Sequence, residues 1–224
     1  MSVRYAIIEG NEGVGKSSVV ANLVSRVDRN KTIVIPVRNP GHSSTGEILR
    51  SALFPANDKF VPSVPVQAML FMAAMRSALD QVESEIKDYQ IKYPEKNILV
   101  ILDRWVYSCW VYQGKDVDID AMEDFAINEI PVDYHFGGTE WTPTVLLTAS
   151  YATARQRMES RAEKLSRYDR MSEEEYTEIT ARYQASGIDM ASFIDTDDLT
   201  ADEVCDAVIQ SLDSQGIPVE WFVS

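Results

Sequence analysis

The segment IIEGNEGVGKSS, residues Ile7–Ser18, decides the fold of this chain. The pattern G-x-x-x-x-G-K-[ST] is fulfilled there by Gly10, Gly15, Lys16 and Ser17. This pattern forms a phosphate-binding loop when it follows a strand and opens a helix, and here an apolar run precedes it and a helical period follows it. Glycines let the backbone curl so that successive N–H groups converge on phosphate oxygens, and the helix N-terminus adds the positive end of its dipole. The segment therefore predicts a nucleotide phosphate site at the first strand-to-helix junction.

The phosphate loop also predicts separate roles for its side chains. Lys16 is expected to reach the β- and γ-phosphates of ATP, and the Ser17 hydroxyl is expected to coordinate Mg²⁺. Contacts with ATP are expected from the whole loop, which comprises Gly10, Asn11, Glu12, Gly13, Val14, Gly15, Lys16, Ser17 and Ser18. A GTPase would also need a guanine-reading N-K-x-D, but the single Asn-Lys pair, Asn30-Lys31, continues as Thr-Ile. ATPases and small-molecule kinases remain.

The composition limits the partners of the chain. Its 224 residues carry a formal net charge of -14, whereas a protein that coats nucleic acid needs Lys and Arg clustered and in excess. The two cysteines, Cys109 and Cys205, lack C-x-x-C spacing, which fits a reducing compartment. The N-terminus has no apolar signal region, and no window approaches the run of about 18 apolar residues that a membrane span needs. We therefore expect a cytoplasmic protein that binds neither nucleic acid nor a membrane.

Strand and helix patterns alternate along the chain. Short runs rich in Ile, Val and Leu, without polar alternation, indicate strands covered on both faces; they lie at Tyr5–Ile8, Thr32–Val37, Asn97–Asp103, Thr144–Ala149 and Ser192–Asp195. Helical stretches lie at Lys16–Asp28, Val64–Tyr89, Asp118–Asn128, Ala152–Lys164, Ser172–Gln184 and Ala201–Gln215, and residues 39–46 and 135–143 have the composition of loops. Such alternation is typical of βαβ units. We expect an α/β protein of three layers, in which helices cover both faces of a central parallel five-stranded sheet, and a single domain over residues 1–224.

Basic residues recur near the ends of these strands, on the side where a doubly wound sheet binds ligands. Arg38 follows the second strand, Arg76 lies on the long helix, and Arg104 follows Asp103 at the end of the third strand. A further basic group on a helix and the loop beyond it contains Arg157, Arg161, Lys164, Arg167 and Arg170. These arginines indicate a second phosphate beside those of ATP.

Five segments together resemble the thymidylate kinases, which transfer the γ-phosphate of ATP to dTMP. Members of that family read EGxDGxGKST, TREPGGTxxGExIR, LFAADR, DRYxxSxxAYQG and R…DRxE, in this order. This chain reads EGNEGVGKSS, VRNPGHSSTGEILR, FMAAMR, DRWVYSCWVYQG and R…RYDRM at similar spacing, over roughly residues 3–185. The resemblance implies a P-loop nucleotide kinase fold with a helical lid near residues 157–172, and Mg²⁺-dependent phosphorylation of dTMP to dTDP by ATP.

The resemblance also implies which groups handle the acceptor phosphate. A monophosphate acceptor is already an anion and needs no general base, so the difficulty lies in bringing two charged phosphates into line. Arg38 and Arg104 are expected to clamp the acceptor phosphate, and Asp103 is expected to hold Mg²⁺ through water. The alternatives are a surface ion pair for Arg38 and a helix cap for Asp103.

The lid is expected to supply further positive charge. Gly13 stands where some family members carry an arginine in the phosphate loop, whereas other members bring basic residues from the lid, and this chain resembles the second kind. The basic lid residues are Arg161, Lys164, Arg167 and Arg170. Arg161 and Arg167 are expected at the transferred phosphate and Arg170 at ATP, although several of these side chains could be merely solvated.

The motifs determine the base site less sharply. In the family, an aromatic residue four positions before the arginine of LFAADR stacks on thymine, and that arginine reaches a base carbonyl. The arginine corresponds to Arg76, and four positions before it is Met72, next to Phe71. Either Met72 contacts the base, or the helix register differs and Phe71 stacks on it. Further contacts with base and sugar are expected from Ser108, Tyr112 and Gln113, with simple packing as the alternative for Tyr112.

Other functions remain open beside dTMP phosphorylation. Asn39 and Met75 replace acidic residues of the family patterns, which leaves open the same reaction on another monophosphate, such as a 5-substituted pyrimidine. A P-loop protein that binds nucleotide without transfer is a second alternative, and a deoxynucleoside kinase with Glu9 as general base is a third. Because family members are usually homodimers, we expect a homodimer, with the apolar residues 64–82 as a face that could pair.

Overall fold

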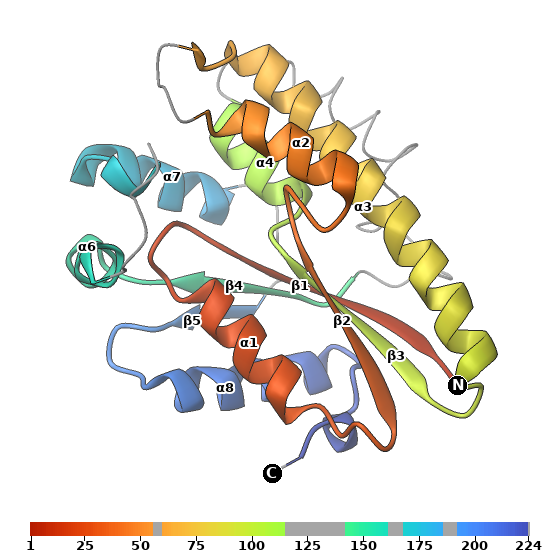
Figure 1. Cartoon of the computed structure of the whole chain (residues 1–224). Helices are drawn as coiled ribbons and strands as arrows, with labels where there is room; N and C mark the ends of the chain where they lie inside the picture. Colours follow the sequence, from red (N-terminus) through yellow and green to blue (C-terminus); the bar gives the residue numbers. More distant parts are fainter. Residues whose placement is uncertain (56–59, 115–141, 161–167, 186–191, 224) are drawn as a thin grey trace.

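The computed structural model of the chain describes residues 1–55, 60–114, 142–160, 168–185 and 192–223. At its centre lies a parallel sheet with the strand order β2-β3-β1-β4-β5 (Figure 1). The strands are β1 (Val3–Gly10), β2 (Thr32–Arg38), β3 (Asn97–Asp103), β4 (Thr144–Thr148) and β5 (Ser192–Asp195). The predicted α/β class with a five-stranded parallel sheet is confirmed.

Side chains of the central strands alternate between two hydrophobic cores, because successive residues of a strand point to opposite faces of the sheet. On β1, Tyr5 and Ile7 belong to the core on one face, whereas Ala6 and Ile8 belong to the core on the other. On β3, every side chain over residues 98–102 is at most 1% exposed. The sequence shows no polar alternation in these strands because both of their faces are covered.

Helices form the two outer layers (Figure 1). One face of the sheet carries α1 (Lys16–Arg26) and α8 (Ala201–Ser214), which share a core. The other face carries α3 (Val64–Lys92), α4 (Val106–Gln113) and α7 (Glu173–Ala185). Further described elements are α2 (Ser44–Leu53), α6 (Tyr151–Glu159) and the 3-10 helices η2 (Tyr168–Arg170) and η3 (Val219–Trp221). None of the described helices has the combination of length and apolar character that crossing a membrane requires.

Among the described residues, two α-helices occur where the sequence predicts none. The prediction of a loop over residues 39–46 is wrong at its end, because α2 begins at Ser44. The Ser43 hydroxyl accepts a hydrogen bond from the Gly46 N–H (2.9 Å) and caps the helix, and Ser and Gly are typical of caps and loops alike. The second helix, α4, is an apolar segment of only 8 residues, too short for a clear helical period. The predicted helix Asp118–Asn128 and loop residues 135–141 lie outside the described residues.

The carboxyl ends of the central strands meet at one edge of the sheet. In the strand register, Asp103 of β3 lies beside Ile8 of β1 on one side and beside Arg38 of β2 on the other. The phosphate loop leaves β1 at this edge and enters α1. Since β1 is central and later strands are added on both of its sides, the chain connections diverge here and leave a crevice.

Candidate functional site

A cavity of about 1020 Å³ opens at this edge of the sheet. Its described lining comes from the phosphate loop, the ends of β2 and β3, and helices α1 to α4, together with η2. The charged and aromatic side chains in that lining are Glu12, Lys16, Arg38, Arg50, Asp103, Arg104 and Asp169, and Phe54, Phe71, Tyr112 and Tyr168. A lining that combines arginines and a lysine with aromatic rings suits a ligand that carries both phosphate and a flat ring.

The phosphate loop has the curled backbone that its glycines predict. Gly13 and Gly15 have φ angles of 77° and 98°, in the left-handed region that favours glycine. At Gly13, an added Cβ atom would lie 2.5 Å from the carbonyl oxygen of Ala154 in α6. Because no side chain fits at this position, Gly13 could not be exchanged for the loop arginine that some thymidylate kinases carry without moving α6.

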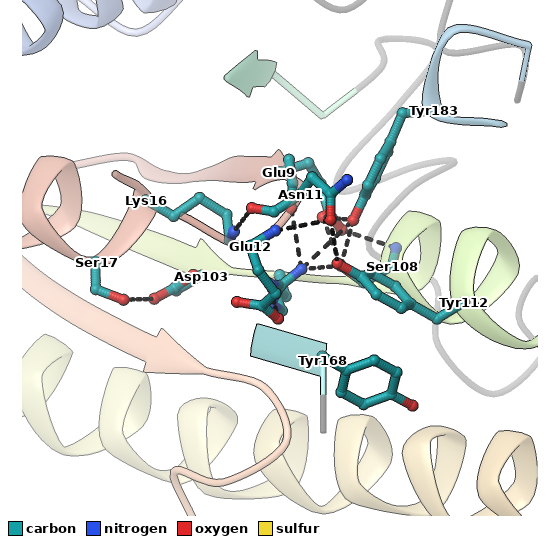
Figure 2. A network of polar contacts seen from close by, with 12 residues as sticks. Glu9, Asn11, Glu12, Lys16, Ser17, Asp103, Ser108, Tyr112, Tyr168 and Tyr183 are labelled. Carbon is teal, nitrogen blue, oxygen red and sulfur yellow. Dashed lines mark hydrogen bonds and ion pairs between the residues drawn. The ribbon is translucent and has the colours of Figure 1, made fainter. Parts of the chain in front are cut away.

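Lys16 lies buried at the start of α1. Its Nζ donates to the backbone oxygen of Asn11 over 2.6 Å (Figure 2). Burial, assisted by the nearby Arg104, lowers the pKa of the Lys16 ammonium to about 8, although Glu12 acts in the opposite direction. Bound phosphate would favour the charged form, so this lysine is prepared for an anionic ligand.

Ser17 and Asp103, the two predicted Mg²⁺ ligands, are in contact. The Ser17 hydroxyl donates to Oδ2 of Asp103 over 3.1 Å, and so joins the start of α1 to the end of β3 (Figure 2). Hydroxyl and carboxylate oxygens fit Mg²⁺, which keeps several waters and uses one or two protein groups together with substrate phosphates. Within the described ranges, no group of three His, Cys, Asp or Glu side chains could hold a metal by itself. The pair therefore fits a Mg²⁺ site that a nucleotide would complete.

Arg104 is held at the junction of the phosphate loop and the cavity. Its φ angle of 68° lies in the left-handed region, where non-glycine residues are uncommon and often functional. Nη1 donates to the Gly10 carbonyl (3.0 Å) and to Oγ of Ser108 (3.1 Å), and Nη2 donates to a carboxylate oxygen of Glu12 (2.6 Å). The guanidinium carbon also lies 5.5 Å from the centre of the Tyr112 ring. These contacts fix the position of the guanidinium before any ligand binds.

Glu9 is a structural residue in this network. Its side chain is fully buried, and Oε1 accepts the N–H groups of Trp105 (2.7 Å) and Ser108 (3.1 Å). Oε2 accepts the hydroxyls of Ser108 (2.7 Å) and Tyr183 (3.1 Å), and burial raises the pKa of Glu9. Glu9 therefore accepts the N–H groups at the start of α4 that have no partner within the helix. Asp103, whose alternative role is to cap this helix, contacts Ser17 instead.

The two arginines around α2 differ in their surroundings. Arg38 lines the cavity. It also forms an ion pair with Glu47 of α2 at 3.0 Å, and such a surface ion pair is the alternative role considered for it. Arg50, which is not among the predicted site residues, donates to the Pro40 carbonyl (3.1 Å) and lies 5.0 Å from the centre of the Phe54 ring. Burial and the charge of Arg38 lower the pKa of Arg50. The sequence could have indicated Arg50 as a site residue, because it is the last residue of the family segment VRNPGHSSTGEILR.

The aromatic wall of the cavity brings together rings from α3, α4, η2 and the end of α2. Phe54 packs edge to face with Phe71 and Tyr168, with ring centres 6.3 Å and 5.9 Å away, and Tyr168 packs likewise with Tyr112 at 5.0 Å. Phe71 belongs to the hydrophobic core and also lines the cavity, whereas Met72 is partly buried against the same core and is not part of the described lining. The register of α3 therefore places Phe71, and not Met72, at this wall.

The residues of the YQG segment divide between cavity and interior. Ser108 and Tyr112 line the cavity, and the Tyr112 hydroxyl donates to Oδ1 of Asn11 over 3.0 Å (Figure 2). Gln113 is buried and lies behind the lining, where its Nε2 donates to the Tyr168 hydroxyl over 3.3 Å. Its Oε1 has no hydrogen-bond partner among the described residues. Gln113 thus supports the aromatic wall from behind.

Arg76 and the two residues that depart from the family patterns, Met75 and Asn39, lie in three different environments. Arg76 lies on α3 but binds Asp80 and Glu83 of the same helix, and it is not part of the described cavity lining. Met75 is fully buried in the hydrophobic core. Asn39 is 2% exposed and lines the cavity, and its Oδ1 has no partner in the described part of the chain. Of the two departures, only Asn39 changes the cavity itself.

The predicted lid is described in part. Three of its basic residues lie outside the described residues: Arg161, Lys164 and Arg167. Arg170 is exposed at the end of η2. Before it, Asp169 lines the cavity, and its carbonyl accepts a hydrogen bond from Arg155 over 2.9 Å. Tyr168 and Asp169 are not among the predicted site residues, although both lie within the segment RYDRM.

Comparisons with known proteins point to one family. A family model described as thymidylate kinase matches residues 8–198. The crystal structure of thymidylate kinase from Ehrlichia chaffeensis is similar with a TM-score of 0.64 and 18% identity, over 95% of this chain and 100% of that chain. Thymidylate kinase from Candida albicans is similar with a TM-score of 0.64 and 17% identity, over 94% of this chain and 91% of that chain. At such low sequence identities, the structural similarity shows a shared fold. The match to the family model extends over most of the length of the chain.

Proposed function

Because the chain belongs to the thymidylate kinase family and is a phosphotransferase, we propose that its cavity is where the γ-phosphate of ATP passes to dTMP. The motif resemblance is confirmed at the level of the family. The observation that carries the proposal is the convergence of three groups on one cavity: the phosphate loop with Lys16, the pair of Ser17 and Asp103, and the arginines Arg38, Arg50 and Arg104. A protein that only bound ATP would have no use for the second set of cations.

At the donor end, the loop N–H groups and the Lys16 ammonium would bind the β- and γ-phosphates of ATP. Ser17 and Asp103 would hold Mg²⁺, which when bound supplies charge neutralisation on the phosphoryl group in transfer. The main task of these residues is therefore to position and neutralise, because phosphoryl transfer leaves little covalent chemistry to the protein.

At the acceptor end, Arg38, Arg50 and Arg104 would surround the phosphate of dTMP. The attacking oxygen of a monophosphate is an anion, so no general base is required. Glu9 agrees with this chemistry, because both of its oxygens are already bound inside the protein and cannot serve a sugar hydroxyl. The rings of Phe71 and Tyr112 would pack against the base.

We propose that residues 1–224 form one domain and that residues 157–172 act as its lid. Two hydrogen bonds tie the described end of that segment to α6: Arg155 donates to the Asp169 carbonyl (2.9 Å), and the Tyr151 hydroxyl donates to the Met171 carbonyl (3.2 Å). Closure would bring Arg170 toward ATP and exclude water. The roles proposed for Arg161 and Arg167 rest on the motif alone.

The reaction is tested by ADP release from ATP and Mg²⁺ with a panel of acceptors: dTMP, dUMP, 5-hydroxymethyl-dUMP, dCMP, dAMP and dGMP. We expect dTMP to give the highest kcat/KM, and thymidine, the non-phosphorylated control, to give no turnover, because the three arginines bind a phosphate. A preference for another monophosphate would show that the acceptor specificity differs from that of the family, as the replacement of an acidic family residue by Asn39 in the cavity lining leaves open. Absence of turnover with every acceptor would refute the kinase function.

We propose that the protein is a homodimer that pairs through α2 and α3. Ile48 on α2 and Val66 and Met69 on α3 are 71%, 44% and 64% exposed. Large apolar side chains exposed on neighbouring helices are typical of protein interfaces. Light scattering should give twice the mass of one chain, and Met69→Glu should give the mass of one chain, because the substitution puts a charge into the interface. A wild-type protein that stays monomeric at micromolar concentration would contradict the proposal.

We also propose a cytoplasmic location. Cys109 and Cys205 are buried free thiols, and burial raises the pKa of the Cys109 thiol to about 12. Buried free thiols fit a reducing compartment.

A further inference from the structure

The loop between β2 and α2 carries a side chain that reaches across to another helix. This loop, residues 39–43, follows Arg38 and ends at Ser43, the cap of α2. Within it, Nε2 of His42 lies 3.4 Å from Oε1 of Glu85 on α3, and the two side chains are 14% and 29% exposed. Because α2 lies beside α3 (Figure 1), the contact joins the β2–α2 loop to the long helix next to it.

The backbone of His42 has a conformation that favours glycine. Its φ angle is 67°, in the left-handed region that side chains other than that of glycine rarely adopt. The family pattern TREPGGTxxGExIR has Gly at this position, where this chain has His42. Glycine would adopt the same backbone without strain, so the backbone does not account for the histidine. What the histidine adds is an imidazole directed at α3.

The imidazole faces a carboxylate in a place that solvent hardly reaches. Nε2 of His42 is buried and has no hydrogen-bond partner in the described part of the chain. Oε1 of Glu85 also accepts a hydrogen bond from Gln81, one turn earlier on α3, over 2.9 Å. The charged side chains of the adjoining β2 and α2, Arg38 and Glu47, pair with each other at 3.0 Å. A protonated imidazole therefore forms an ion pair with Glu85, whereas a neutral one is held weakly.

The β2–α2 loop also positions a cation of the acceptor end. The Pro40 carbonyl accepts a hydrogen bond from Nη1 of Arg50 over 3.1 Å. A second contact between the loop and α3 joins the hydroxyls of Ser43 and Ser77 at 2.8 Å. A loop that moved away from α3 would carry the Pro40 carbonyl with it, and the guanidinium of Arg50 would lose its anchor.

We propose that His42 is a positioning residue of the acceptor site: through Glu85 it fastens the β2–α2 loop to α3, most strongly when the imidazole is protonated. The inference rests on the proposed function in so far as Arg38 and Arg50 bind the acceptor phosphate. The apparent affinity of a ligand falls with the fraction of molecules that have the binding-competent conformation. Loss of the contact between His42 and Glu85 should therefore weaken acceptor binding without affecting the transfer step.

The test compares the KM for dTMP of the wild type, His42→Asn and Glu85→Gln at pH 6 and at pH 8. Asparagine tolerates a positive φ but carries no charge, and glutamine keeps the shape of Glu85 without its charge. At pH 6 both variants should have a KM about threefold higher, with kcat and the KM for ATP unchanged. At pH 8 the three proteins should agree, because histidines lose their charge between pH 5 and 8. Comparison of the proteins at one pH cancels the titration of the phosphate of dTMP itself.

Asp88→Asn is the matched control. It removes one negative charge from an exposed position on the same helix, and its KM for dTMP should equal that of the wild type at both pH values. A KM of His42→Asn and Glu85→Gln that is unchanged at pH 6, or that rises equally at pH 6 and pH 8, would overturn the proposal.

Calorimetric titration with inorganic phosphate separates this inference from the proposed function. A wild type that failed to phosphorylate dTMP would refute the proposed function, and the phosphate titration would then decide the role of His42. Weaker phosphate binding by both variants at pH 6, but not at pH 8, would support the positioning role. Equal binding by the wild type and both variants at pH 6 would refute it.

Discussion

Replacing Arg104 by methionine should lower kcat/KM for dTMP by about 10³-fold, because a positioned donor to the phosphoryl group is lost. It should also lower the free energy of unfolding by about 3 kcal/mol, because the enclosed carboxylate of Glu12 loses its partner. The Gly10 carbonyl and the Ser108 hydroxyl lose a donor at the same time. Steady-state kinetics and urea unfolding measure the two effects.

The two effects of Arg104→Met can be separated. Adding Glu12→Gln to the same chain removes the unpaired charge, so part of the lost stability should return while the activity stays low. Arg26→Met serves as control: it breaks the partly exposed pair with Asp206 and should cost less than about 1 kcal/mol without loss of activity. If Arg104→Met kept the wild-type kcat/KM, Arg104 would have no part in acceptor binding.

Replacing Lys16 by methionine should reduce kcat by about 10²-fold to 10³-fold and yet make the free enzyme more stable at pH 7. The pKa of Lys16 in the folded protein, about 8, is below its ordinary value of 10.5. Holding the ammonium charged in the folded state at pH 7 therefore costs about 3 kcal/mol, and loss of its hydrogen bond to Asn11 offsets about 1 kcal/mol of the gain.

The difference in stability between Lys16→Met and the wild type should depend on pH. Below pH 8, the lysine is charged in both the folded and the unfolded chain, so the whole cost is present and the variant has its largest advantage in stability. Between pH 8 and 10.5 the folded protein carries the neutral amine, and the advantage should disappear. Urea unfolding of both proteins at pH 7 and pH 10 measures this difference. A variant less stable than the wild type at pH 7 would show that burial of the Lys16 ammonium does not destabilise the folded protein.

The sheet and the donor-phosphate site could be predicted because their signals are local. Apolar runs mark the strands, and the period that follows the phosphate loop marks α1. The curl at Gly13 and Gly15 and the dipole of α1 depend on residues that are neighbours in the chain. Contact between Ser17 and Asp103 is less local, but parallel strands bring their carboxyl ends to one edge, so it also follows from the strand pattern.

What the sequence by itself determined is thus the family, the parallel sheet and the phosphate loop. Tertiary structure alone decided the acceptor side, because it depends on contacts between residues far apart in the chain. Rotation of α3 against the core selects Phe71 over Met72 for the cavity. Glu9 accepts the N–H group of Trp105, the residue before α4, across a separation of 96 residues, and Glu12 meets Arg104 across a separation of 92 residues. Such pairings arise only when packed elements fix the distance between two side chains, and no local pattern encodes that distance.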